Sequence, residues 1–247
     1  MPNLLYETFW RLGSYRYPLY RSELRTLFDF YVKTQYLVLD AGCGDRGGYI
    51  LKMSICAQGI GLDIDREIVK RSVKLSKDHQ VHNLSFLIGD LEKLPFRKNL
   101  FNIIICCDVL EHLNDSEKAI ENFALSLKKE GRLLISTSNL LNPVMFADIM
   151  LPRKVSEASI RKFGGPIYHK RTCRFSPWNL AKKLNKYGLT VENLLMFGFP
   201  PFGRPWRYQY SEIRLPKIYY LWIVFNKLTN GWVLKKFKEN MLVVAKK

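Results

Sequence analysis

From residue 36 onward, short apolar runs alternate with longer segments in which apolar residues recur every three or four positions. A short apolar run is typical of a buried strand, whereas the longer spacing is typical of an amphipathic helix. Because strands that alternate with helices form parallel sheets with helices packed on their faces, the sequence predicts an α/β fold. The expected strands are 36–40, 59–63, 84–88, 102–107 and 132–137, and the expected helices are 48–56, 66–78 and 115–129.

Capping signals indicate where two helices begin. Asn114, with Glu117 three residues later, predicts the start of the helix 115–129. Ser176 is expected to cap a later helix that has Pro177 at its first position and ends at Gly188. Two final strands are then expected in the segments LTVENLLMF and MLVVAKK.

A glycine-rich turn, VLDAGCGDRGG at 38–48, follows the first expected strand. Gly42, Gly44 and Gly47 have the spacing of a dinucleotide-binding turn. However, Asp40 precedes the first glycine by two positions, and its carboxylate would repel a pyrophosphate. The same carboxylate would attract the ammonium and sulfonium groups of S-adenosylmethionine. The turn therefore favours S-adenosylmethionine over NAD, and the absence of a Gly-Lys-Ser/Thr ending disfavours a nucleoside triphosphate.

Acidic residues also end the second and third expected strands. Asp63 lies 19 residues after Gly44, where a carboxylate can accept hydrogen bonds from ribose hydroxyls. Asp90 can accept from an exocyclic amine while the Leu91 backbone meets the ring edge, as an adenine would require. Each acid could instead be an ordinary strand-end residue. Open α/β sheets bind ligands at the carboxyl ends of their strands, so three acids there favour a ligand site.

Five segments stand in the order and spacing of a known family: VLDAGCG, GLDID, GDLEKLPF, CCDVLEHL and EGRLLIST. In these segments the chain resembles the class I S-adenosylmethionine-dependent methyltransferases, in particular the small-molecule and quinone-biosynthesis branch of type 11. The resemblance covers 35–138 well and 167–197 loosely. It implies a doubly wound, Rossmann-like sheet of seven strands with the last strand antiparallel, helices on both faces and the cofactor across strands 1 to 4. The cofactor-binding residues that it implies are Asp40, Gly42, Gly44, Asp63, Ile64, Asp90, Leu91 and Asp108.

Methylation of a hydroxyl also requires a general base. His112 and His169, two of the four histidines, are the catalytic candidates, and a structural role is the alternative for each. Asp108, Glu111 and His112 also resemble a cluster with which some O-methyltransferases hold a divalent metal. Many relatives have similar residues without metal, so no metal site is expected.

Positive charge is concentrated in the C-terminal part of the chain. Residues 151–247 contain 20 Lys and Arg against 4 Asp and Glu, which indicates an anionic partner. The apolar run 218–225 is too short to span a bilayer but suits its interface. Peripheral contact with an anionic membrane is therefore expected, and the alternative is that 218–225 is a core helix whose flanking lysines face water. RNA is the second expectation for a partner.

We expect one domain over 1–247, located in the cytoplasm, because neither a signal peptide nor a spanning segment is evident. The leading function is methylation of a hydroxyl on an anionic or lipid-linked small molecule. The alternatives are an RNA methyltransferase and a non-catalytic adenosylmethionine-binding protein. The expected parts are an N-terminal helical segment (1–34), the cofactor-binding core (35–138), a substrate-side insertion (139–175), and a C-terminal part (176–247) with a basic, aromatic connection (198–240).

Overall fold

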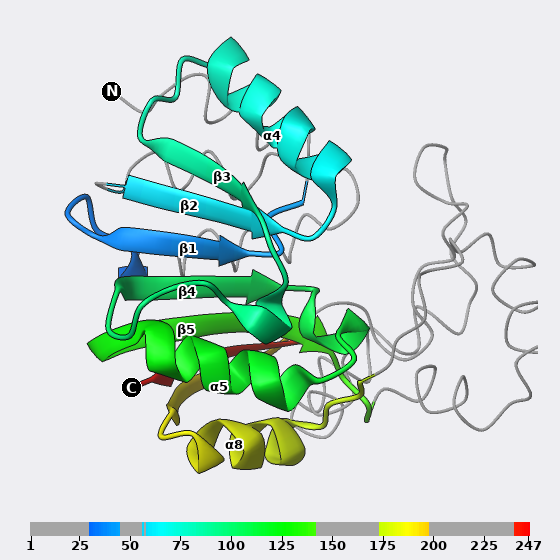
Figure 1. Ribbon diagram of the computed structural model, residues 1–247. Helices are drawn as coiled ribbons and strands as arrows, with labels where there is room; N and C mark the ends of the chain where they lie inside the picture. Colours follow the sequence, from blue (N-terminus) through cyan, green and yellow to red (C-terminus); the bar gives the residue numbers. More distant parts are fainter. Residues whose placement is uncertain (1–29, 45–55, 57, 142–172, 198–239) are drawn as a thin grey trace, which may run out of the picture.

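Seven strands form one sheet in the order β3-β2-β1-β4-β5-β7-β6 (Figure 1). The computed structural model describes residues 30–44, 56, 58–141, 173–197 and 240–247. Strands β1 to β5 pair in parallel, and β7 is antiparallel to both of its neighbours. The predicted α/β fold with an antiparallel last strand is thus confirmed. The strands are β1 (Leu37–Ala41), β2 (Gln58–Asp63), β3 (Leu84–Ile88), β4 (Phe101–Cys107), β5 (Leu127–Ser138), β6 (Thr190–Phe197) and β7 (Asn240–Lys246).

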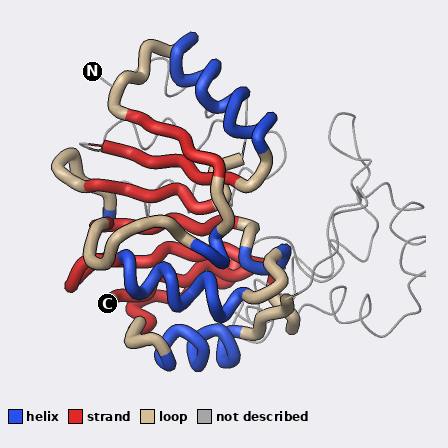
Figure 2. The backbone as a smooth tube through the Cα atoms, viewed as in Figure 1, coloured by secondary structure: helices blue, strands red, loops and turns tan. Residues whose placement is uncertain are grey.

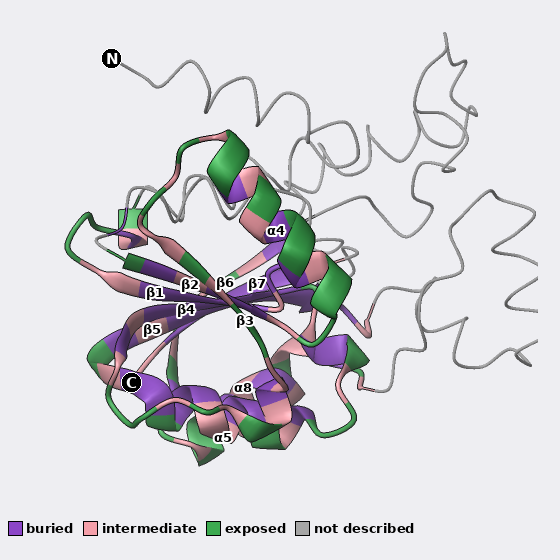
Figure 3. Cartoon of the chain, turned by 45° about the horizontal axis from the view of Figure 1, so that its top comes forward, coloured by how far each residue is buried: buried purple, intermediate pink, exposed green. Residues whose placement is uncertain are grey.

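Helices cover both faces of the sheet (Figures 1 and 2). In Figure 3, α4 lies on one side of the sheet, while α5 and α8 lie on the other. Side chains alternate along each strand, so Leu39 packs with the helices α5 and α8, whereas its neighbour Val38 joins a second cluster. The α-helices are α4 (Arg66–Asp78), α5 (Ser116–Ser126) and α8 (Pro177–Lys186), and the short 3-10 helices are η1 (Leu91–Lys93) and η2 (Leu110–His112).

Two details of the helix expected at 115–129 were wrong. Its N-cap is Asp115 rather than Asn114, because the Asp115 side chain accepts from the backbone N–H of Lys118. The helix ends at Ser126, because buried Leu127 already pairs with Phe101 of β4 as the start of β5. A long-range strand pairing thus overrides the local helical pattern.

The C-terminal helix has the predicted capping. The Ser176 hydroxyl accepts from the N–H of Asn179, the Asn179 side chain accepts from the N–H of Ser176, and Pro177 is the first helical residue. Gly188 has a φ of 75°, the left-handed conformation that favours glycine after a helix.

Other predictions concern residues outside the described ranges. These are all but the last residue of the expected helix 48–56, most of the N-terminal segment, residues 142–172 of the insertion, and residues 198–239 with the apolar run 218–225. Within the described ranges, no helix combines the length and apolar character that a membrane crossing requires. The expectation of a single domain stays a prediction.

Candidate cofactor-binding site

The predicted acidic residues gather at one edge of the sheet. Asp40 lies near the end of β1, and Asp63 ends β2. Asp90 lies two residues after the end of β3, and Asp108 directly follows β4. These four strands are parallel, so their carboxyl ends meet at the same edge. The fold therefore brings together residues that are far apart in the sequence, at the place where open α/β sheets bind ligands.

Asp40 is a buried carboxyl group that lacks a full set of partners. Its exposed fraction is 1%, and among the described residues no hydrogen-bond donor reaches its Oδ2 atom. Burial raises the pKa of Asp40 to about 8, and the nearby charge of Asp63 adds to this effect. A buried carboxylate without a partner is costly, whereas a cationic group beside it would be a favourable partner. Asp40 thus fits the cationic end of S-adenosylmethionine.

The glycine turn is held in place by the second strand. The N–H groups of Gly42 and Cys43 donate to the carbonyl of Leu62 at 2.7 and 3.1 Å. The N–H of Gly44 donates to Oδ2 of Asp63 at 3.1 Å, and the carbonyl of Gly44 accepts from the Ser72 hydroxyl of α4 at 2.9 Å. The Asp63 carboxylate therefore holds the turn in place, and it lies at the edge of the sheet where open α/β sheets bind ligands.

The two glycines of the turn meet different surroundings. Both have positive φ values, 78° for Gly42 and 57° for Gly44. A β-carbon on Gly42 would lie 2.4 Å from Cγ2 of Val109, whereas one on Gly44 would meet no atom of the described residues within 4 Å. Within the described part of the chain, the turn is therefore packed against the loop after β4 at Gly42 and open at Gly44. Because glycine has no side chain, the space beside the Gly44 backbone stays free for a bound cofactor.

The segment after β3 is a capped turn attached to α5. The Asp90 side chain accepts from the N–H of Glu92 at 2.9 Å and so caps η1. Leu91 is buried, and its carbonyl accepts from the Asn122 amide of α5 at 3.1 Å. Ile64, which follows Asp63, is 72% exposed, so its apolar side chain is available to a ligand.

The loop after β4 contacts β5 through its two acidic residues. Oδ1 of Asp108 accepts from the Ser136 hydroxyl at 2.9 Å, and Asp108 itself has a φ of 57°. Buried Glu111 accepts from the hydroxyls of Thr137 at 2.8 Å and Ser138 at 3.2 Å. These three hydroxyl donors were not predicted from the sequence, although the polar run STS directly after the apolar residues of β5 indicates them.

The candidate base and metal residues are only partly described. His112 is exposed and lies in η2, and His169 lies outside the described residues. Within the described part of the chain, no three His, Cys, Asp or Glu residues are grouped as a metal site would require. The Glu111 carboxylate, one member of the cluster considered above, is engaged with hydroxyls of β5.

Comparisons with known proteins agree with this geometry. Residues 33–171 match the family model of a methyltransferase domain. The chain is 31% identical over 103 residues to the uncharacterized methyltransferase YcgJ of Bacillus subtilis, a match covering 42% of this chain and 41% of that protein. It is 31% identical over 105 residues to a ubiquinone biosynthesis O-methyltransferase of Coxiella burnetii, covering 41% and 43%. The chain thus spans about two-fifths of the length of these relatives.

A solved structure shares the fold over nearly all of this chain. It is a putative methyltransferase from Bacillus halodurans, which superposes with a TM-score of 0.63 at 19% sequence identity. The superposition covers 92% of this chain and 99% of that chain.

Proposed function

The chain belongs to the class I S-adenosylmethionine-dependent methyltransferases, and from this premise we propose that it transfers a methyl group to a hydroxyl of an anionic or lipid-linked small molecule. The family match confirms the predicted family, and solved S-adenosylmethionine-dependent methyltransferases of the same fold support the predicted cofactor. The observation that carries the catalytic proposal is the buried, incompletely partnered Asp40 carboxylate beside a glycine turn that is open at Gly44. This combination suits a cationic cofactor end and disfavours a pyrophosphate.

Each predicted residue has a proposed part in holding the cofactor. Asp40 and the turn would bind the methionine end, and Asp63 would accept from the ribose hydroxyls. Asp90 and the Leu91 backbone would bind the adenine. Ile64 would pack on the cofactor, and Asp108 would line its methyl-donating end. When bound, the cofactor supplies an electrophilic methyl group, and the residues of this chain align the acceptor with it and exclude water.

The acceptor class is inferred from two observations. One relative is a ubiquinone biosynthesis O-methyltransferase, which suggests an oxygen acceptor on a lipid-linked molecule. The net charge of +16 in residues 151–247 suggests that the acceptor, or the surface from which it comes, is anionic. His169 or His112 would remove the hydroxyl proton as general base. We also propose that 1–247 is one domain and that the protein is cytoplasmic.

One labelling experiment tests this proposal. The purified protein is incubated with methyl-labelled S-adenosylmethionine and separate lipid, small-molecule and RNA fractions, with an Asp40→Asn variant as control. Label in a small-molecule or lipid product that depends on Asp40 supports the proposal. Label in RNA alone would show that the acceptor is RNA and not a small molecule or lipid. Cofactor binding without any labelled product would indicate a non-catalytic binding protein.

A further inference from the structure

Helix α8 has a buried stripe and an opposite exposed face of unusual composition. Leu180 and Leu184 are fully buried in the core. Successive residues of an α-helix are turned by about 100°, so Trp178 and Lys182 point away from this buried stripe. Trp178 is 63% exposed, and Lys182 is exposed one helical turn after it. A large apolar ring thus lies beside a cation on the outer surface of the helix.

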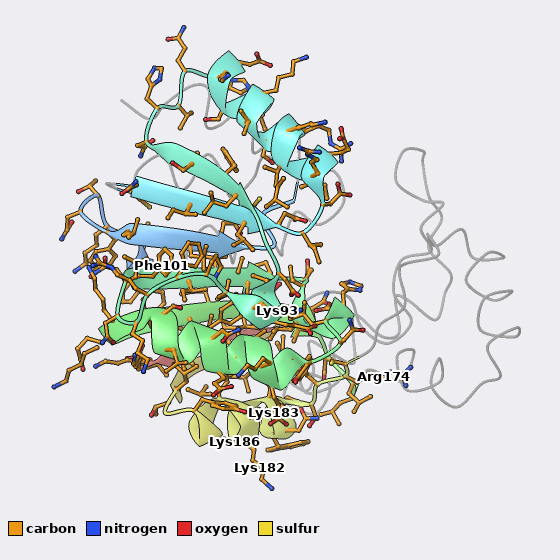
Figure 4. The ribbon with its side chains drawn as sticks, in the orientation of Figure 1. Lys93, Phe101, Arg174, Lys182, Lys183 and Lys186 are labelled. Carbon is orange, nitrogen blue, oxygen red and sulfur yellow. The ribbon has the colours of Figure 1, made fainter. Side chains whose placement is uncertain are left out.

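The surroundings of this face are cationic. Exposed Arg174 precedes the helix, and Lys182, Lys183 and Lys186 lie on it, as Figure 4 shows. Among the three described α-helices, α8 alone contains no acidic residue. On the neighbouring helix, Glu117 of α5 accepts from Lys183 and from Lys186. That pairing attaches the flank of α8 to α5 and does not involve Arg174 or Lys182.

Helix α8 lies at one end of the described part of the chain. The helix packs on β6, which is the edge strand of the sheet. In Figures 1 and 2, no described element lies outside α8. Within the described part of the chain, the face is therefore accessible to a partner.

We propose that this face, formed by Arg174, Trp178 and Lys182, docks on a bilayer that contains anionic lipids. Tryptophan rings settle at the headgroup level of a membrane. Lysine and arginine extend charged ends from apolar stems and are attracted to anionic headgroups. A single aromatic ring on a convex helix suits a planar surface, whereas proteins that bind single-stranded nucleic acid use a groove with successive aromatic rings.

This proposal is independent of the proposed methyl transfer. The sequence predicted the same class of partner for the run 218–225, but the residues named here are different and lie on α8 or shortly before it. Membrane docking of α8 requires neither the cofactor nor the acceptor. Failure of the docking test would therefore leave the catalytic proposal unchanged.

Vesicle co-sedimentation tests the docking surface directly. The full chain is mixed with phosphatidylcholine vesicles, with or without phosphatidylglycerol, over a range of salt. We expect binding only when the anionic lipid is present, and weaker binding as salt rises. In the double variant Arg174→Gln and Lys182→Gln, the partition coefficient should fall by about fivefold for each cation removed. Trp178→Ala should also weaken binding, and should do so at high salt as well.

Matched controls separate this surface from a general effect of charge or apolarity. Lys74→Gln with Lys77→Gln removes the same charge from exposed positions of α4, on the other side of the sheet. Phe30→Ala removes an aromatic ring that is 73% exposed. Phe30 precedes Val32, which belongs to the core cluster of Val38 and not to the cluster on which α8 packs. Both controls should bind as the wild type does, and thermal unfolding would show that every variant is folded.

Three results would overturn the proposal. The first is that the wild type does not sediment with anionic vesicles. The second is that the α8 variants bind the vesicles as well as the wild type does, and the third is that the α4 control loses as much binding as the α8 double variant. The same variants are also tested with RNA. If they lost RNA binding while their vesicle binding was unchanged, the face would belong to a nucleic acid and the proposal would be wrong.

Discussion

Gly42 lies so close to Val109 that a β-carbon on the glycine would be 2.4 Å from Cγ2 of the valine. This contact joins the turn after β1 to the loop after β4, which are the two segments that face the methionine end of the cofactor in our proposal. Gly44, two residues further along the same turn, has no described residue within 4 Å of the place where its β-carbon would be. The two glycines are therefore required for different reasons.

Alanine substitutions should separate these reasons. Both Gly42→Ala and Gly44→Ala place a side chain at a positive φ, which costs about 1–2 kcal/mol. Only Gly42→Ala adds a clash, so it should lower the free energy of unfolding by more than Gly44→Ala does. Urea denaturation measures both values. Adding Val109→Ala should recover part of the loss in Gly42→Ala and none of it in Gly44→Ala, and strictly additive effects would contradict the role of this contact.

Asp40→Asn should stabilise the ligand-free protein increasingly as pH rises. The pKa of Asp40 is raised from 3.8 to about 8 by burial, so the folded state binds the proton more tightly than the unfolded state. The wild type therefore loses stability as pH rises from about 4 to about 8, whereas asparagine has no charge to bury. Urea denaturation at several pH values measures the difference between the two proteins. If the difference did not grow with pH, another group of the protein would already stabilise the buried charge of Asp40 in the absence of ligand.

Asp63 should influence both the cofactor and Asp40. Asp63→Ala removes the acceptor of the Gly44 N–H and the proposed ribose acceptor, and should weaken S-adenosylmethionine binding by about 1–3 kcal/mol. Calorimetry measures this loss, and an unchanged dissociation constant in a folded variant would place the ribose elsewhere. Asp63→Asn keeps a hydrogen-bond acceptor but removes the charge that helps to raise the pKa of Asp40. It should therefore lower the pH at which the loss of stability is complete and reduce the size of that loss, as urea denaturation at several pH values would show.

The sequence was sufficient for elements determined by local pattern. Helix α4 begins and ends where its pattern predicts, and Asp40 and Asp63 lie at one edge of the sheet, as expected for the strand ends of a parallel sheet. The end of α5 was missed because Leu127 is held by a strand pairing with Phe101, which no local pattern encodes. The contacts of Glu111 were missed for the same reason, since its partner Thr137 lies 26 residues away in the sequence.

Glu111 should contribute to stability through its two hydroxyl donors. Glu111→Ala leaves the buried hydroxyls of Thr137 and Ser138 without this acceptor and should cost about 1.5–3 kcal/mol in the free energy of unfolding. Glu121→Ala is the matched control, because this carboxylate lies on α5 in an exposed pair with Lys118 and should cost no more than about 0.5 kcal/mol. Thr137→Val should have little further effect in the Glu111→Ala background. Equal losses for the two glutamates would show that the buried hydrogen bonds of Glu111 contribute no more to stability than the surface pair of Glu121 does.

The two histidines should differ in which kinetic property they change. A general base acts on the acceptor, so its replacement should lower turnover by about 100-fold or more and leave cofactor affinity intact. We expect this result for His169→Gln, measured with the acceptor identified by the labelling experiment. His112 lies in η2, directly after the Glu111 that is attached to β5. If its role is structural, His112→Gln should alter cofactor affinity or unfolding more than turnover. Unchanged turnover in His169→Gln, together with a 100-fold loss in a folded His112→Gln that still binds S-adenosylmethionine, would assign the base to His112 instead.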